Sequence, residues 1–139
     1  MNQKILTVSI AAYNVSKYLD EALEPFTNSV YKDELEILIV DDGSKDSTLT
    51  LAQEWAAQYP EKIVVESMSR NSGVAKARNW GALQSSNEFI AFLDADDAYE
   101  QGALEVAAAT FHFQPDTSVV RLALKPIDLP TRYAEHTYF

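Results

Sequence analysis

The chain has 139 residues, of which 47% are hydrophobic, so it holds enough apolar material for the core of one ordinary domain. It contains no cysteine, which excludes disulfide bridges and thiolate metal sites and leaves oxygen ligands or the two histidines, His112 and His136, for any metal; Mg and Mn are therefore expected. Its formal net charge of -10, with only 11 Lys and Arg residues, argues against a nucleic acid partner, because phosphate backbones are bound by clustered basic side chains.

The chain shows no segment typical of export or of a membrane. Its first residues, MNQKILTVSIAAYN, lack the basic, apolar and small-residue regions of a signal peptide. No apolar run reaches the roughly 18 residues that a membrane helix needs. We therefore expect no membrane span in this chain and a cytoplasmic location.

Short apolar stretches, rich in β-branched residues or Phe, predict four strands that are buried on both faces. They are Ile5–Ala12, Glu36–Val40, Ile63–Ser67 and Phe89–Leu93. A fifth strand is expected at Val119–Leu124, ahead of a stretch that prolines interrupt.

Segments with the apolar spacing of an amphipathic helix lie between these strands and after the fourth one. The spacing runs from Leu19 to Phe26, from Leu51 to Tyr59 and from Leu104 to Phe111. Short polar residues and glycine mark helix starts at Ser16, at Asp46 or Ser47, and at Asn71 to Gly73. The alternation of strand and helix predicts a single α/β domain with a mostly parallel sheet.

Polar residues follow every predicted strand, at Tyr13–Asn14, Asp41–Ser44, Arg70–Gly73 and Asp94–Asp97. The carboxyl ends of parallel strands meet at one edge of the sheet, where ligands of such sheets bind. Turn formation alone would account for any one of these loops. Two acidic clusters at one edge are harder to explain in that way, because neighbouring carboxylates repel unless a cation or a donor compensates them. The pattern therefore favours a bound metal or ligand.

The segment Asp94–Asp97 has the composition of a metal site. Asp94 and Asp96 are two residues apart, so they share a face if the strand continues, and Asp97 begins the turn. Mg binds through one or two carboxylates and keeps waters and substrate phosphates in its coordination shell. A D-x-D sequence at a strand end therefore suits a metal bound to a diphosphate.

Four motifs together resemble the family 2 glycosyltransferases in order and spacing. They are VSIAAYN (8–14), ILIVDDGSKDST (37–48), NSGVAKARNWGA (71–82) and FIAFLDADD (89–97). The resemblance covers Leu6 to Gln114. It implies a GT-A fold, which is a Rossmann-like, mostly parallel sheet flanked by helices. It also implies inverting transfer of a sugar from a nucleotide-diphosphate sugar, commonly a UDP-sugar, to a hydroxyl of a saccharide or other acceptor, with Mn or Mg on the diphosphate.

The resemblance assigns roles to particular residues. Tyr13 would stack on the base, Asp42 would accept a hydrogen bond from it, Asp41 would shape their loop, and Arg78 would face the donor pocket. Asp94 would bind the ribose. The nucleotide-binding residues implied are Ala11, Tyr13, Asp41, Asp42, Arg78, Asp94, Ala95 and Asp96, and the metal residues are Asp96 and Asp97. The resemblance leaves open which of these last two is the direct ligand.

Other aromatic and basic side chains are left out of the site. Trp80 is predicted to pack in the core rather than to stack on a sugar, because a buried Trp usually serves the core. His112 and His136 are single histidines without metal spacing, so neither is a candidate ligand. Lys76, together with Arg78, would offset the charge of the carboxylates.

No catalytic residue is assigned, because the general base of this family lies in the acceptor half and is expected beyond Phe139. We interpret residues 1–139 as a donor-binding domain without its acceptor half, inactive on its own. An apolar face left without cover would make a homo-oligomer possible. The alternative is a non-catalytic nucleotide-binding or scaffolding module.

Three other enzyme or signalling folds fit less well. Haloacid-dehalogenase-like domains and receiver domains carry their acidic residues after the first strand, whereas the D-x-D here follows the fourth. A sugar nucleotidyltransferase opens with a Gly-rich, basic loop after the first strand, and the corresponding run AAYNVSKYL has no glycine.

Overall fold

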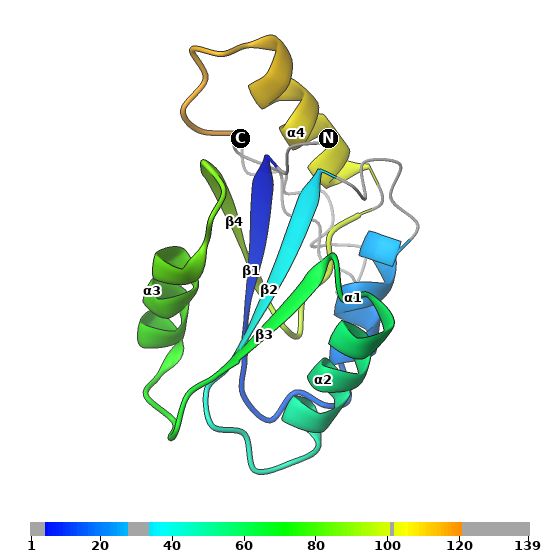
Figure 1. The fold of residues 1–139 in the computed structure, drawn as a ribbon, viewed down its shortest axis with the longest axis vertical. Coiled ribbons are helices and arrows are strands. Elements are labelled where there is room, and N and C mark those ends of the chain that lie inside the picture. The colour runs from blue at the N-terminus through cyan, green and yellow to red at the C-terminus, as the bar shows by residue number, and fades with distance from the viewer. Residues whose placement is uncertain (1–4, 28–33, 101, 121–139) are drawn as a thin grey trace, which may run out of the picture.

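The computed structural model describes residues 5–27, 34–100 and 102–120, which form alternating strands and helices (Figure 1). The elements are β1 (Leu6–Ala12), α1 (Leu19–Thr27), β2 (Leu35–Asp41), α2 (Thr48–Gln58), β3 (Ile63–Ser67), α3 (Val74–Gln84), β4 (Phe89–Asp94) and α4 (Ala103–Phe113). The four predicted strands are confirmed, with ends that differ by one residue or none. No helix in these ranges combines the length and the apolar character that crossing a bilayer requires.

The four strands form one parallel sheet in the order β3-β2-β1-β4. Leu6 of β1 pairs with Leu35 and with Phe89, and Ile37 of β2 pairs with Val8 and with Ile63, so β1 and β2 are the inner strands. The chain moves outward from β1 through β2 to β3 and then crosses back to place β4 on the free side of β1. The strand order therefore reverses between β1 and β4, and such a reversal opens a crevice at the carboxyl ends of the strands.

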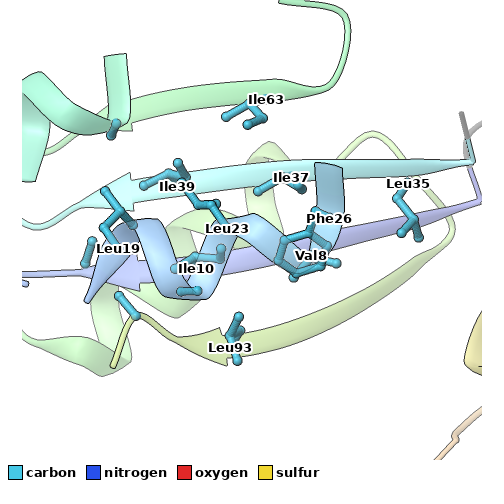
Figure 2. Close-up of a cluster of buried hydrophobic side chains, with 14 of the residues drawn as sticks. Val8, Ile10, Leu19, Leu23, Phe26, Leu35, Ile37, Ile39, Ile63 and Leu93 are labelled. Atoms are coloured by element: carbon cyan, nitrogen blue, oxygen red, sulfur yellow. The ribbon is translucent and has the colours of Figure 1, made fainter. Parts of the chain in front are cut away.

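The main core lies on the side of the sheet that α1 and α2 cover. Side chains alternate along each strand, and Leu6, Val8 and Ile10 of β1 all point to this side. Figure 2 shows Leu19, Leu23 and Phe26 of α1 packed over Val8 and Ile10, and each of these three α1 residues is at most 2% exposed. At about 25 cal/mol per Å² of apolar area buried, this layer is the main source of fold stability.

Helix α3 packs on the opposite side of the sheet (Figure 1). Its buried residues are Ala77 and Gly81, which lie against β1 and β2. A Cβ atom at Gly81 would lie 2.0 Å from Oγ of Ser9, so the helix backbone approaches the sheet more closely than any side chain would allow.

The predicted core role of Trp80 is wrong. The residue is 39% exposed and belongs to neither buried cluster. Successive helix residues are turned by about 100°, and the neighbouring Gly81 faces the sheet, so the indole is directed away from the layer that it was expected to fill.

The expected burial of every strand on both faces holds for β1 and β2 but is wrong for the two outer strands. Val64 of β3 is 41% exposed and Phe92 of β4 is 43% exposed. Val64 pairs with Leu38 of β2, and Phe92 pairs with Ser9 of β1, so both lie on the α3 side of the sheet. Helix α3 covers only the middle of that side. Val119 and Val120 belong to no strand, and residues 121–124 of the predicted fifth strand lie outside the described residues.

Helix starts agree in part with the sequence. Gly73 precedes α3 as predicted, and Ser47 precedes α2, although Asp46 supplies the capping oxygen by accepting the Thr48 N–H at 2.9 Å. Ser16 is not the start of α1, which begins at Leu19, because the Val15 carbonyl first closes a turn with the N–H groups of Tyr18 and Leu19.

Candidate functional site

A cavity of about 250 Å³ opens at the carboxyl ends of the strands, where the strand order reverses. Six of its lining residues were predicted from the sequence, namely Ala11, Tyr13, Asp42, Asp94, Ala95 and Asp96. Six others also line it, namely Ala12, Val15, Asn71, Gly73, Val74 and Ala77. The loops after all four strands therefore converge here. Those after β2 and β4 contribute carboxylates, whereas those after β1 and β3 contribute uncharged residues.

Asp42 is a buried wall of this cavity, with 3% of its surface exposed. Its Oδ1 accepts the Ser72 N–H at 2.7 Å, and its Oδ2 accepts the Gly73 N–H at 2.8 Å. The carboxylate thus ties the loop after β2 to the start of α3, where free N–H groups favour a negative charge. Each oxygen retains a further lone pair, so the group can still accept a hydrogen bond from a ligand.

Asp41 lies beside Asp42 but does not line the cavity. It is 1% exposed, and the Ser44 N–H lies 3.3 Å from each of its two oxygens, while Ser67 Oγ lies 3.4 Å from Oδ2. Its contacts hold the loop together, in keeping with the loop-shaping role expected for it. Direct contact with a ligand has no support in this geometry.

The turn at Gly43 brings the loops after β2 and β3 into contact. Gly43 has φ of 72°, and a Cβ atom there would lie 2.7 Å from the carbonyl carbon of Arg70. Only glycine meets both conditions without strain.

Arg78 reaches the cavity through Asp94 rather than by lining it. Its Nη2 donates to Oδ1 of Asp94 at 2.5 Å, and both side chains are a little less than half exposed. Its Nε atom is buried and has no hydrogen-bond partner within the described part of the chain. Arg78 therefore offsets one carboxylate of the acidic cluster, whereas Lys76 is exposed on the same helix.

Asp96 and Asp97 follow β4 and are both exposed. The Asp97 N–H donates to the Asp94 carbonyl at 2.9 Å, which closes a turn, and of the two aspartates Asp96 lines the cavity. Within residues 5–27, 34–100 and 102–120, no three acidic or histidine side chains converge as a metal cage. One or two carboxylates at the rim fit a hard divalent cation that takes its other ligands from water and phosphate oxygens.

The loops after β1 and β2 are joined by a hydrogen-bonded cluster that we call the loop clamp, formed by Asn14, Ser16, Ser44, Asp46 and Thr48. Asn14 has φ of 53°, a left-handed conformation that asparagine tolerates. Its Oδ1 accepts the N–H groups of Lys45 at 2.8 Å and Asp46 at 3.4 Å. The Thr48 hydroxyl, which donates to Asp46, is the main cause that lowers the pKa of Asp46 to about 2.

Several residues in the cavity wall could not be predicted from the sequence. Val15, Val74 and Ala77 are apolar residues in or beside helix starts, and such residues carry no chemical signal of binding. Asn71 belongs to the polar loop Arg70–Gly73 that was expected at this edge of the sheet, but it had been given no role beyond marking a helix start.

A parallel α/β sheet with an acidic cavity at its switch point is the arrangement of the GT-A glycosyltransferases. The chain belongs to glycosyl transferase family 2, which matches residues 7–137. It is 33% identical over 127 residues to the minor teichoic acid biosynthesis protein GgaA of Bacillus subtilis, which covers 88% of this chain and 28% of that protein. The chain thus spans less than a third of the length of this relative.

Solved structures agree with this assignment. Residues 1–349 of TarS from S. aureus, in a complex with UDP-GlcNAc, superpose with a TM-score of 0.73 at 31% identity, over 80% of this chain and 32% of that one. The mannosyltransferase PcManGT of Pyrobaculum calidifontis, in a complex with GDP-Man and Mn2+, gives a TM-score of 0.72 at 24% identity, over 91% of this chain and 36% of that one. The second likeness concerns the fold alone.

Proposed function

We propose that this chain is the donor-binding domain of an inverting glycosyltransferase, and that its cavity binds a nucleotide-diphosphate sugar together with Mn or Mg. The observation that carries the proposal is the cavity wall itself. Tyr13, Asp42, Asp94 and Asp96 come from three separate loops and line one space at the switch point of the sheet.

The nucleoside would lie between the loops after β1 and β2. Tyr13 is 38% exposed at the cavity, so its ring offers a flat apolar face on which a base can stack. Asp42 retains lone pairs for an N–H group of the base, and the imide of uracil supplies one such donor. Because the TarS structure holds UDP-GlcNAc at 31% identity, we propose a UDP-sugar as the donor.

The ribose and the diphosphate would lie toward the end of β4. Asp94 would accept from a ribose hydroxyl, and Asp96, which lines the cavity, would be the direct metal ligand in preference to Asp97. A divalent cation bound there would act as a Lewis acid that neutralises the leaving diphosphate. In a chain of net charge -10, an acidic cavity repels a bare diphosphate, so a cation is needed for binding.

For the reaction, we propose attack of an acceptor hydroxyl on the anomeric carbon with inversion and loss of a nucleoside diphosphate. This chain's residues would hold and orient the donor, and that alignment is a large part of the rate enhancement of a two-substrate reaction. A general base must take the hydroxyl proton, and no described residue is assigned that task. The cytoplasmic location expected from the sequence belongs to the same proposal.

Titration calorimetry with UDP tests the proposal. The chain should bind UDP in the presence of Mn or Mg and lose that binding when EDTA removes the cation. ADP serves as the control for base recognition and should bind more weakly. Binding of UDP that EDTA leaves unchanged would contradict the role of the metal, and no binding under any of these conditions would contradict the donor site.

A further inference from the structure

Three consecutive backbone N–H groups beside the cavity donate to side chains of a distant loop. Asn14 N donates to Ser44 Oγ at 3.0 Å, Val15 N donates to Thr48 Oγ1 at 2.9 Å, and Ser16 N donates to Asp46 Oδ2 at 3.3 Å. The two segments are about 30 residues apart in sequence. The path of the chain directly after Tyr13 is therefore fixed by the loop after β2.

Asp46 is the point at which the two halves of this loop clamp meet. Its Oδ1 accepts the hydroxyl of Thr48 at 2.5 Å and the Thr48 N–H at 2.9 Å. Its Oδ2 accepts the hydroxyl of Ser16 at 2.8 Å as well as the Ser16 N–H. One carboxylate thus receives four donors, two from each loop.

Thr48 connects this carboxylate to the cavity wall. Its side chain is fully buried, and its Oγ1 donates to Asp46 while it accepts from the N–H of Val15, which lines the cavity. A threonine hydroxyl has one proton, so with that proton held by Asp46 its oxygen is oriented to accept from Val15. The hydrogen bond from the Val15 N–H to Thr48 therefore depends on the one that Thr48 donates to Asp46.

Asp46 itself does not line the cavity and is exposed to solvent, so it has no direct route to a ligand there. Tyr13 directly precedes the three tied N–H groups and lines the wall, as Val15 does, and its ring is the larger of these two side chains at the cavity. We propose that Asp46 is a positioning residue, which acts through Thr48 and Ser16 to hold the Tyr13 ring in the orientation that a nucleoside base requires.

This inference rests on the donor site proposed above, and a double-mutant cycle tests it. The dissociation constant for UDP with Mn is measured for the parent, Tyr13→Ala, Asp46→Ala and the double variant. Tyr13→Ala and Asp46→Ala should each weaken binding about tenfold, the order expected for losing one well-made stacking or charge-assisted contact. Because Asp46 acts through the ring, Asp46→Ala should have little further effect once Tyr13 is alanine.

Two more variants refine the test and guard against a folding failure. Asp46→Asn keeps an oxygen for Thr48 but presents an amide nitrogen to Ser16, so its affinity should lie between those of the parent and Asp46→Ala. Thr48→Val has nearly the same shape and removes the hydroxyl that donates to Asp46 and accepts from the Val15 N–H, so it should weaken UDP binding in the same direction.

Asp20→Ala is the matched control. Asp20 also accepts a side-chain hydrogen bond between two elements, from Trp55 Nε1 at 2.6 Å, but it lies away from the cavity wall. Its loss should leave the affinity for UDP unchanged while it lowers thermal stability. All measurements are made at least 15 degrees below the lowest melting temperature of the set, a margin of about two to four times the shift caused by 1 kcal/mol.

The outcomes separate the two proposals. If the parent binds UDP and Asp46→Ala binds it equally well, the positioning role is wrong and the donor site stands. If Asp46→Ala weakens binding by the same factor with and without Tyr13, Asp46 acts on the fold in general and the positioning role is again wrong. A parent that binds no UDP with any cation overturns the donor site and the positioning role together.

Discussion

The two sides of the cavity are built in different ways. On the side of β1 and β2, the loop clamp and Asp42 hold the wall with side-chain to backbone hydrogen bonds between distant loops. On the side of β4, Asp96 and Asp97 are exposed, and Arg78 with Asp94 is the ion pair that the described residues supply. The first side is organised by contacts within the protein, whereas the second presents exposed carboxylates.

The difference matches the chemistry proposed for each side. A base is recognised by shape and by one or two hydrogen bonds, so a fixed wall lowers the entropy lost on binding. A divalent cation with a diphosphate brings its own strong charges and needs few protein ligands. The following predictions test whether one side is indeed preformed and the other completed by its ligand.

The largest effect is expected at Asp96. Asp96→Ala should lower the affinity for UDP with Mn by at least about 10- to 100-fold, the range found for outer-shell partners of metal sites, because a direct ligand is lost. The thermal stability of the metal-free variant should not fall, since one like charge is removed from an acidic cluster. Calorimetry and thermal melts measure both, and Asp97→Ala, at the residue outside the cavity wall, is the matched control. A less stable Asp96→Ala chain would instead indicate a structural turn.

On the organised side, Asp42→Asn should affect both folding and binding. The amide keeps one oxygen for one of the two backbone N–H groups and leaves the other buried without an acceptor, which costs about 1 to 3 kcal/mol of unfolding free energy. Affinity for UDP should fall as well, because the base loses its charged acceptor. Urea denaturation and calorimetry measure the two effects. An unchanged free energy of unfolding would show that this wall is not preformed.

Much of the fold follows from local pattern, but its outer parts do not. Short apolar runs located all four strands, because a strand inside a parallel sheet must be apolar on both faces. The same runs predicted that Val64 and Phe92 are buried, whereas they are 41% and 43% exposed. How much of a sheet face a helix covers depends on how the elements pack, which a local sequence pattern does not contain. Trp80 was misplaced for a related reason, because the small Gly81 rather than the large indole meets the sheet.

The site could be predicted as far as strand ends determine it. The rule that ligands bind beyond the carboxyl ends of parallel strands placed Tyr13, Asp42 and Asp96 together, as the structure has them. The loop clamp could not be predicted, because Asn14 and Asp46 are about 30 residues apart and each is an ordinary turn residue by itself.

A smaller effect is expected from Arg78, the one basic residue that the structure places at the β4 side. Arg78→Met should change the free energy of unfolding by less than about 1 kcal/mol, because its ion pair with Asp94 is nearly half exposed. Lys76→Met removes the same charge from the same helix and is the control. A loss of several kcal/mol for Arg78→Met alone would mean that the β4 side is preformed too, and the contrast between the two sides would disappear.

The smallest effect is a pH dependence of the loop clamp. The pKa of Asp46 is about 2 in the folded chain, below its ordinary value of 3.8, so the ionised carboxylate stabilises the fold. This contribution is complete above the ordinary value and is lost as the pH falls toward the folded value. The difference in free energy of unfolding between the parent and Asp46→Asn should therefore be constant from pH 7 to about 5 and shrink toward pH 2. Urea denaturation across this range measures it, and a difference that grows on acidification would contradict the assignment.

The width of the cavity depends on the close approach of Gly81 to Ser9, because residue 81 has a hydrogen atom where any other residue has a side chain. Helix α3 contributes Val74 and Ala77 to the cavity wall, and Gly73 directly precedes it. The helix lies as close to the sheet as it does because residue 81, two turns along, has no side chain. A methyl group at that position would lift the far end of α3 and tilt its near end, moving three wall residues relative to Tyr13 and Asp42. The spacing between the α3 wall and the wall formed by Tyr13 and Asp42 is thus set at a contact between helix and sheet, by a residue that does not line the cavity.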